Sequence, residues 1–394
     1  GFGLLLASFL VKKMKDFSNF GTITEYLETR YNSKFLRSAS AFLSMVALIA
    51  LVGSQVGAAV GIMNALGMKN TTIAALFACI VIIALTSMGG LMAVTVTDGF
   101  QIILVMVGVV WITVAALGDI GGLSGLNASL TAIQSELPEG YNVFMDSEKF
   151  KSLLWMILPG LMYIMIGQDI YQRLFACKDH KTAIKASVCS AVLVCIVSVM
   201  PVTLGLIARV KHPELATAGT SAAAFATIAM STLPGWAVGI IIAAALSAIF
   251  STADSCLSAA ASHFMTDLYL PYIGKNVDTK DRRLVTISRA FTVIAGLAAV
   301  GVSMLLPTIL DGCFYAYYIY TSGVFCPIVF GVFWKKATKQ GAIAGLLAGG
   351  LFMMYALLTG FSVAGIGGEL LSGIVSAIVL VVVSLATQPK KTAA

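Results

Sequence analysis

The chain has 394 residues, of which 59% are hydrophobic and 11% charged, and its formal net charge is +7. Soluble domains carry about 25% charged residues, so a soluble protein of this composition would lack the polar groups needed to cover its surface. The composition excludes a soluble globular protein and predicts an all-α polytopic membrane protein, because one helical span needs about 20 apolar residues.

Apolar runs along the chain predict ten complete membrane-spanning helices and one partial helix. The partial helix comprises residues 1–11. The complete helices are expected at 39–66, 72–88, 92–118, 152–172, 186–208, 235–262, 284–306, 313–334, 341–360 and 366–387. No linker rich in Pro, Gly or Ser separates them, so residues 1–394 are interpreted as a single transmembrane domain.

Lysine and arginine residues are distributed unequally between the loops on the two sides of these helices. Of the 25 basic residues, 20 lie in one set of loops, and the alternate loops hold only Lys69, Lys149, Lys151, Arg209 and Lys211. Basic residues concentrate in cytoplasmic loops, so we expect a cytoplasmic C-terminus. The basic excess is a topology signal and predicts no nucleic-acid partner. The absence of a GxxxxGK[ST] motif from the sequence predicts no nucleotide partner.

The span 235–262 carries a polar stripe. Its serines share one helical face and are Ser247, Ser251, Ser255, Ser258 and Ser262. Each serine alone is explained by a hydrogen bond to its own i−4 carbonyl, but Asp254 beside them is not, because a carboxylate at a helix centre costs about 2.5–3.5 kcal/mol. No basic residue within a span offers to neutralise Asp254. A bound cation, a proton or a water-filled cavity would, and oxygen ligands of this kind suit a hard cation.

Two further spans contain polar or helix-breaking residues. Asp98 enters an apolar run near its expected cytoplasmic end, where it marks either a solvated helix start or a transport pathway. Pro159-Gly160 inside 152–172 predicts either a kink or a break, and broken helices supply midplane sites in many transporters. Tyr163, one turn later, would face the break. The next polar residues, expected at a solvated cytoplasmic end, are Gln168, Asp169, Gln172 and Arg173.

Tyrosines crowd the outer half of the span 313–334. They are Tyr315, Tyr317, Tyr318 and Tyr320. Aromatic residues at a membrane interface explain some of them, and others are expected to line an outer vestibule. The seven cysteines and three histidines lie singly, without the spacing of metal ligands or a disulfide framework. The sequence therefore predicts no transition-metal site and no enzyme.

Five stretches of the chain together resemble the sodium:solute symporter family, which includes the proline, pantothenate, sialic acid and sodium/glucose symporters. They are TITEYLETRYNSKFLR (22–37), SMGGLMAVTVTDGFQ (87–101), GQDIYQRLFACKD (167–179), AIFSTADSCLSAAASHFMTDLY (248–269) and FWKKATKQGAIAG (333–345). The resemblance implies a LeuT-like core of two five-helix inverted repeats. It makes 1–118 an incomplete first repeat without core helix 1, 152–334 the second repeat, and 341–387 two additional helices. The chain is thus expected to be part of a longer protein.

The resemblance also implies two cation positions. A sodium site is expected at the hydroxyls of Ser251 and Thr252 and the carbonyl of Ala248. A possible second cation would be bound by Asp98, Ser251, Asp254 and Ser255.

The substrate pathway is implied less directly. Tyr163 matches an aromatic inner gate of sugar-transporting relatives, and we add Gly160 and Tyr318 as pathway residues. Val194 stands where sugar-transporting relatives have a lysine that binds the sugar. A carboxylate or amino acid is therefore expected in preference to a sugar.

These observations predict a sodium-coupled secondary active symporter that imports a small polar solute by alternating access. Its partners would be sodium, the solute and the lipid bilayer, with no cofactor other than the coupling ion, and its location a bacterial cytoplasmic membrane. The alternatives are a transporter-like sensor module, a channel, a proton-coupled carrier, and a fragment that inserts into the membrane without transporting anything.

Overall fold

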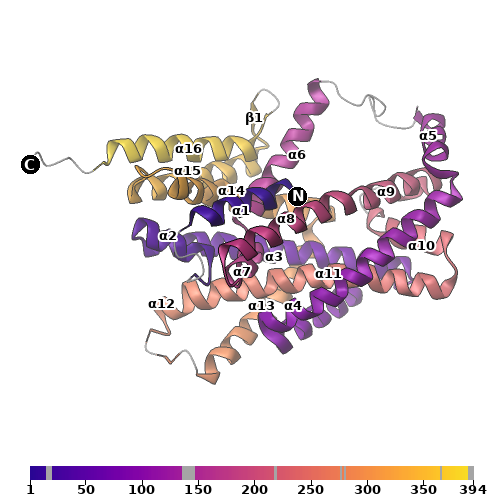
Figure 1. The fold of residues 1–394 in the computed structure, drawn as a ribbon, viewed down its shortest axis with the longest axis horizontal. Coiled ribbons are helices and arrows are strands. Elements are labelled where there is room, and N and C mark those ends of the chain that lie inside the picture. The colour runs from indigo at the N-terminus through magenta and orange to yellow at the C-terminus, as the bar shows by residue number, and fades with distance from the viewer. Residues whose placement is uncertain are drawn as a thin grey trace, which may run out of the picture.

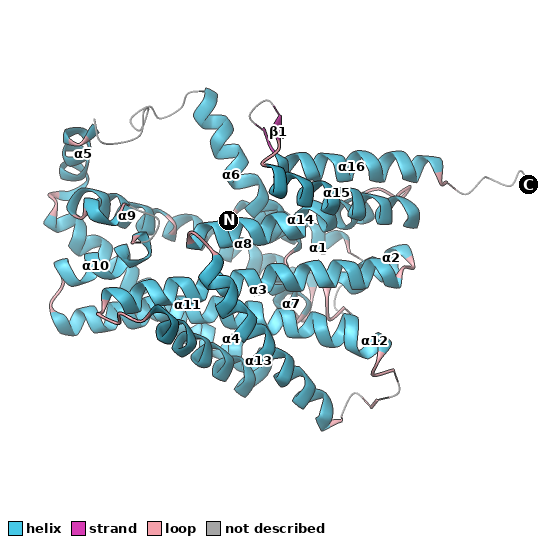
Figure 2. Ribbon diagram, turned by 180° about the vertical axis from the view of Figure 1, so that it is seen from behind, coloured by secondary structure: helices cyan, strands magenta, loops and turns pink. Residues whose placement is uncertain are grey.

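The structure is a computed structural model that describes residues 1–14, 20–134, 147–216, 220–275, 277–278, 281–363 and 366–388. The side chains of residues 88–94, 147–152, 155 and 369 lie outside this description. Nearly all described residues are helical (Figures 1 and 2). The all-α prediction is confirmed.

Helices occupy the chain in sequence order. The first part contains α1 (Phe2–Lys13), α2 (Ile23–Tyr31), α3 (Lys34–Ala65), α4 (Thr71–Asp119) and α5 (Gly122–Ala132). The middle part contains α6 (Ser147–Ile166), α7 (Gln168–Phe175), α8 (His180–Val197), α9 (Val199–Lys211), the 3-10 turns η3 (Pro213–Leu215) and η4 (Ser221–Ala223), and α10 (Ala224–Thr232).

The last part begins with α11 (Gly235–His263), which continues into the π-helix η5 (Phe264–Tyr269) and α12 (Leu270–Tyr272). It then contains α13 (Arg282–Leu305), α14 (Ile309–Phe333), α15 (Lys339–Thr359), the antiparallel strands β1 (Ser362–Val363) and β2 (Ile366–Gly367), and α16 (Gly368–Ala386).

Seven helical segments of the described chain are long and apolar enough to cross a membrane. The predicted spans 72–88 and 366–387 correspond to shorter apolar helices, Thr71–Ser87 and Leu370–Ala386. The predicted boundary between 72–88 and 92–118 is wrong as an element boundary, because both lie in α4. No proline interrupts this stretch, and the glycine pair Gly89-Gly90 does not end a helix by itself. Three predicted loops contain the short helices α2, α5 and α10.

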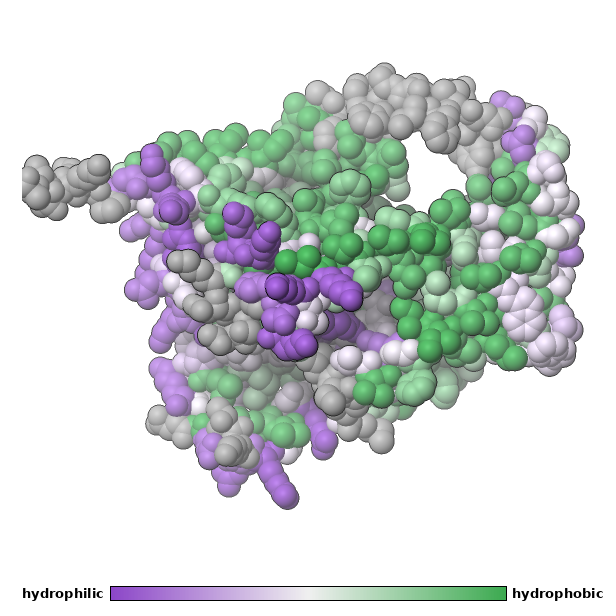
Figure 3. All heavy atoms as spheres, in the orientation of Figure 1, coloured by the Kyte–Doolittle hydropathy of each residue, from purple (hydrophilic) through white to green (hydrophobic). Residues whose placement is uncertain are grey.

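The two ends of the molecule differ in chemistry. Figures 1 and 2 place α2 and α12 at one end and α5 and α10 at the other. Figure 3 shows hydrophilic side chains gathered at the end with α2 and α12, whereas apolar side chains cover much of the rest of that face. Basic residues are frequent in three segments of the sequence, at 30–37, 178–185 and 335–339. The basic residues of the chain are thus concentrated towards one end of the molecule.

The centre of the fold is α11, which packs against α3, α4 and α13. Small residues such as Ala253 and Ala260 are fully buried there and allow the neighbouring helices to approach closely. A similar close approach joins α15 to α16. A Cβ added at Gly345 would lie 2.8 Å from Leu380 Cβ. The polar stripe of α11 is therefore carried by a helix held on several sides.

Candidate functional site

The helix predicted at 152–172 is broken, but at Gly167 and not at Pro159-Gly160. Pro159 lies inside α6, and Gly167 separates α6 from α7 with an extended backbone (φ −66°, ψ 129°). A Cβ on Gly167 would lie 2.7 Å from Asp169 Oδ1 and 3.1 Å from a Tyr163 ring carbon. A side chain at position 167 would displace the Asp169 carboxylate, so the close approach of these groups favours glycine at the break, whereas a proline removes only one backbone bond and is tolerated where neighbouring groups compensate.

Four polar side chains from α4, α7 and α11 meet beyond this break. The Arg173 Nη2 atom lies 2.7 Å from Asp98 Oδ2 and 2.5 Å from Ser255 Oγ. The Ser251 hydroxyl donates a hydrogen bond to the other oxygen of Asp98, and the Ser255 hydroxyl donates to the Ser251 carbonyl at 2.8 Å. Sequence analysis grouped Asp98, Ser251 and Ser255, and the structure brings them together.

A cavity of about 320 Å³ opens beside this cluster. It is lined by Asp98, Gln101, Ile102, Val105, Arg173, Ala248 and Ser251. Thr252 is not among the lining residues. Its exposed hydroxyl donates to the Ala248 carbonyl at 3.0 Å, which is the local back-bond expected of a helical threonine. Of the three residues expected to bind sodium, Ala248 and Ser251 thus line the cavity, and the Thr252 hydroxyl is bonded to the Ala248 carbonyl.

Asp254 differs from Asp98 in its surroundings. Asp254 is 5% exposed, and its Oδ1 atom accepts no hydrogen bond from the described residues. Gln101 Oε1, at the cavity, is likewise buried without a described donor. Buried acceptors of this kind are uncommon. Carboxylate and amide oxygens with free lone pairs are suited to a hard cation.

Arg173 is the site residue that sequence reasoning placed elsewhere. The hydropathy pattern put it at a solvated helix end, and its side chain is indeed 37% exposed. Because the break at Gly167 starts a new helix, however, Arg173 turns towards Asp98 and α11 and supplies the positive charge that no span provides. The available signal was the isolated carboxylate of Asp98 in an apolar run, since such a charge needs a partner.

An aromatic group surrounds the break itself. The Tyr163 hydroxyl donates to Asp169 Oδ1 at 2.9 Å, and its ring lies 4.7 Å from Tyr317 and 6.0 Å from Tyr320 between centroids. The Tyr320 hydroxyl donates to the carbonyl of Ile166, the last residue of α6, at 3.1 Å. Tyr163 is 3% exposed, so this group closes the space beside the break.

The other expected pathway residues lie around this aromatic group. A Cβ on Gly160 would find Tyr317 Cε2 as its nearest neighbour, at 3.6 Å, so space alone does not require a glycine there. Tyr318 stacks on Phe314 with a centroid distance of 5.9 Å.

Comparison with known proteins adds independent information. The sequence profile of the sodium:solute symporter family matches residues 2–349. The chain is 30% identical over 376 residues to a sodium/glucose cotransporter of Vibrio parahaemolyticus, covering 85% of the chain and 66% of that protein. It is 28% identical over 351 residues to a sodium/pantothenate symporter of Haemophilus influenzae (86% and 69% covered) and 26% identical over 367 residues to a sodium/proline symporter of Escherichia coli (88% and 71% covered). The chain thus spans about two thirds of the length of these relatives.

A solved structure shares the fold. It is a Na⁺-coupled sialic acid symporter in a substrate-bound outward-open state, with a TM-score of 0.73 and 17% sequence identity. The alignment covers 99% of this chain and 85% of the solved one. The expected LeuT-like fold class is confirmed.

Proposed function

The chain belongs to the sodium:solute symporter family, whose members are transporters and not enzymes, and from this premise we propose that it couples inward sodium movement to the uptake of a small polar solute. Sodium and solute would favour the same conformation of the protein, which is the thermodynamic basis of coupling. The relatives that match are named for sodium with glucose, pantothenate or proline, so the solute class extends over sugars, carboxylates and amino acids. Val194 favours a carboxylate or amino acid.

The observation that carries the proposal is the polar cluster that α11 shares with α4 beside the cavity. Ala248 and Ser251 of α11 line the cavity, the Ser251 hydroxyl donates to Asp98, and Thr252 lies one position further along the helix. The proposed sodium site consists of these α11 groups, with the Thr252 hydroxyl turning from the Ala248 carbonyl to the ion. A site built of neutral hydroxyl and carbonyl oxygens beside one carboxylate suits a monovalent hard cation.

Arg173 bears on the number of sodium ions. Its guanidinium lies between Asp98 and Ser255, two of the groups assigned to a second cation. A tethered positive charge on Arg173 would therefore compete with a second sodium for these two groups. We propose one sodium per cycle with Arg173 in place, and a second cation at Asp98, Ser251, Asp254 and Ser255 only when Arg173 moves away.

The orientation in the membrane follows from the charge distribution. The basic α2 end is proposed to face the cytoplasm together with the C-terminus. The relatives named above are bacterial, and we propose the bacterial cytoplasmic membrane as the location.

The test is the thermal stability of the purified full-length protein in sodium, potassium and choline salts of equal ionic strength. A ligand that binds only the folded state raises the unfolding midpoint. We expect a sodium-specific rise that is lost in Ser251→Ala and retained in Ser262→Ala. Ser262 is a matched control, because its hydroxyl donates to the Ser258 carbonyl at 3.0 Å on the same helix. Equal midpoints in all three salts would reject sodium coupling and favour a proton-coupled carrier or a sensor module.

The solute class is tested separately by uptake into proteoliposomes under an inward sodium gradient. Labelled amino acids, small carboxylates and glucose are compared one at a time, and choline replaces sodium as the control. Uptake of glucose alone would reject the preference for a carboxylate or amino acid and leave sodium coupling intact.

A further inference from the structure

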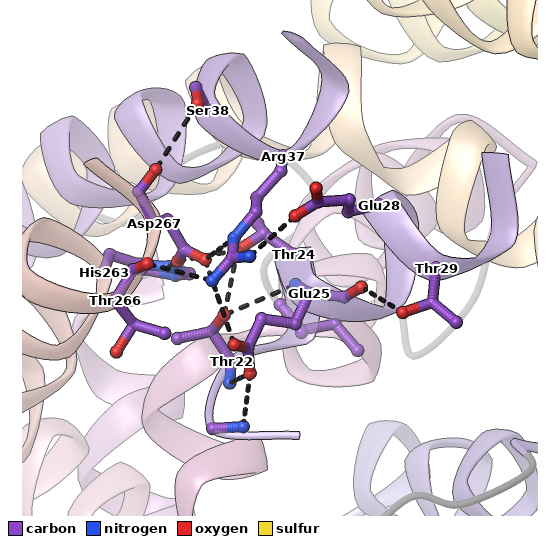
Figure 4. A network of polar contacts seen from close by, with 12 residues as sticks. Thr22, Thr24, Glu25, Glu28, Thr29, Arg37, Ser38, His263, Thr266 and Asp267 are labelled. Carbon is purple, nitrogen blue, oxygen red and sulfur yellow. Dashed lines mark hydrogen bonds and ion pairs between the residues drawn. The ribbon is translucent and has the colours of Figure 1, made fainter. Parts of the chain in front are cut away.

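A second polar network lies at the α2 end of the molecule, centred on Asp267 of η5 (Figure 4). The Asp267 side chain is fully buried. Its oxygens accept hydrogen bonds from four side chains: His263 Nδ1 at 2.7 Å, Arg37 Nε at 2.6 Å, the Thr22 hydroxyl at 2.9 Å and the Thr24 hydroxyl at 2.7 Å. A carboxylate that is buried and bonded in this way holds its partners together strongly. The network thus fastens the start of α2 to the end of α11.

Thr22 has two functions in this network. Its hydroxyl also accepts from the Glu25 N–H in the capping box that begins α2. Glu25 and Glu28 in turn bind the Arg37 guanidinium at 2.9 and 2.6 Å (Figure 4). The helix α2 is therefore fixed to α3 and α11 at its first turn.

The segment Gly21–Ile23, at the start of α2, also contacts α7. Gln168 is fully buried. Its Oε1 atom accepts from the Ile23 N–H at 2.9 Å, and its Nε2 atom donates to the Gly21 carbonyl at 3.0 Å. Gly21–Ile23 therefore joins two helices: Asp267 of η5 binds the side chain of its middle residue, and Gln168 of α7 binds the backbone of its outer residues.

The other end of α7 contacts the candidate cation site. Gln172 Nε2 donates to the Ser255 carbonyl at 3.2 Å, and Arg173 bonds to Ser255 and Asp98. The eight residues of α7 thus span the distance between the cation site and α2. Because Gly167 is extended, α7 is a separate helix from α6, and the hydrogen bond from the Tyr163 hydroxyl to Asp169 joins the two helices beside this break.

We propose that Gln168 is a positioning residue that transmits sodium occupancy from the site on α4 and α11 to the closed state of the cytoplasmic end. This inference rests on the sodium coupling proposed above. With sodium bound, Ser255 and Asp98 hold Arg173 and Gln172, and α7 presents Gln168 to Gly21 and Ile23. When sodium leaves, α7 turns and the two bonds of Gln168 break, whereas Asp267 keeps α2 on α11. Gln168 is thus the releasable contact and Asp267 the permanent one.

Hydrogen–deuterium exchange of the peptide covering residues 20–27 tests this inference, because the Ile23 amide hydrogen is itself bonded to Gln168. Exchange is compared in sodium and potassium for the full-length wild type, Gln168→Leu and Thr29→Ala. Thr29 is the matched control on α2, since its exposed hydroxyl bonds only to the Glu25 carbonyl among the described residues. We expect sodium to slow exchange about three- to tenfold in the wild type and in Thr29→Ala. Gln168→Leu should exchange quickly in both salts.

The thermal shift of each variant separates this inference from the proposed function. Gln168→Leu is expected to keep its sodium-specific rise in unfolding midpoint, because Gln168 does not line the cation cavity. If the wild type shows the thermal shift but equal exchange in the two salts, the coupling role is rejected and sodium binding stands. If neither quantity depends on sodium, both proposals fall.

A second variant guards against a folding defect in Gln168→Leu. Gln168→Glu keeps an acceptor for the Ile23 N–H and loses the donor to the Gly21 carbonyl. Its sodium-dependent slowing should lie between those of the wild type and Gln168→Leu. Full sodium protection in either Gln168 variant would overturn the inference.

Discussion

Two carboxylates on the continuous helix formed by α11 and η5 have opposite surroundings. Asp267 is fully buried and accepts from four side chains of three segments. Asp254, thirteen residues earlier, is 5% exposed and has one oxygen without a donor among the described residues. A saturated buried carboxylate stabilises the fold, whereas an unsaturated one is destabilising until a cation or proton reaches it. The comparison thus assigns permanent structure to one end of this helix and exchangeable binding to its middle.

The two arginines that pair with these regions, Arg37 and Arg173, differ in the same way. Arg37 binds Asp267, Glu25 and Glu28 with its side chain 14% exposed, so several bonds hold it. Arg173 pairs with Asp98 while 37% exposed, beside a cavity. Solvent screens such a pair and lowers its contribution to stability. Arg173 is therefore the more easily displaced of the two, as a cation site that empties in each transport cycle requires.

The largest expected effect comes from removing the saturated carboxylate. Asp267→Ala leaves Arg37 and His263 without their buried acceptor, and we expect a loss of about 3–5 kcal/mol in the free energy of unfolding, equal in sodium and potassium. Unfolding in a denaturant titration of the detergent-solubilised protein measures it. The matched control is Asp119→Ala, whose partner Lys211 lies at 2.9 Å in an exposed pair, with an expected loss below about 1 kcal/mol. Equal losses of unfolding free energy at the two positions would contradict the structural role assigned to Asp267.

Replacing Asp254, the carboxylate with one unbonded oxygen, should not destabilise the protein as Asp267→Ala does. Asp254→Asn is expected to leave stability in potassium unchanged or higher, because asparagine places no charge at this buried position. The sodium-specific stabilisation should persist while Arg173 stays in place, because the proposed sodium site on α11 does not include Asp254, and its loss would place Asp254 at that site. For the wild type that stabilisation is about 2.7 kcal/mol at a sodium concentration of 100 times Kd. Thermal unfolding in the two salts measures both quantities. A large loss in potassium would show that Asp254 is instead a structural residue like Asp267.

Arg173→Gln tests the exchangeable pair directly. We expect a stability loss of about 1 kcal/mol or less and a steeper sodium dependence of uptake, because Asp98 becomes free to bind a second sodium. Arg173→Lys is the control, since it keeps the positive charge beside Asp98 and should keep the wild-type slope. An unchanged slope in Arg173→Gln would remove the explanation of Arg173 as a substitute for the second cation.

Sequence analysis predicted the helices and their polar residues better than the contacts between residues far apart in the chain. Hydropathy identified the helix that contains Ser251 and Asp254, because apolar spans and polar interruptions are local properties of the chain. The grouping of Asp98 with Ser251 came from family resemblance, and the structure places them in contact. Their role as cation ligands stays a prediction. Hydropathy did not distinguish α2 from a loop, because its nine residues are amphipathic and short.

The misplaced features all depend on tertiary contacts. Pro159 is the stronger local helix breaker, yet the break lies at Gly167, where a Cβ would displace the Asp169 side chain. Arg173 belongs by composition to a solvated helix end, and only the new helix that starts after the break turns it towards Asp98. Asp267 lies 230 residues from Arg37 in the sequence, a separation across which no local pattern predicts an ion pair.

Two isosteric substitutions, with the smallest expected effects, distinguish the structural role of the Asp267 network from the cation binding proposed for the middle of α11. Thr24→Val removes one of the four donors to Asp267 and should cost about 1 kcal/mol in both salts. Thr252→Val removes an exposed hydroxyl that bonds to the carbonyl of its own helical turn. It should cost nothing measurable in potassium while raising the sodium concentration for half-maximal uptake about fivefold, since one proposed ligand is lost. If Thr24→Val changed the sodium requirement and Thr252→Val did not, the assignment of structure to the end of the helix and of cation binding to its middle would be wrong.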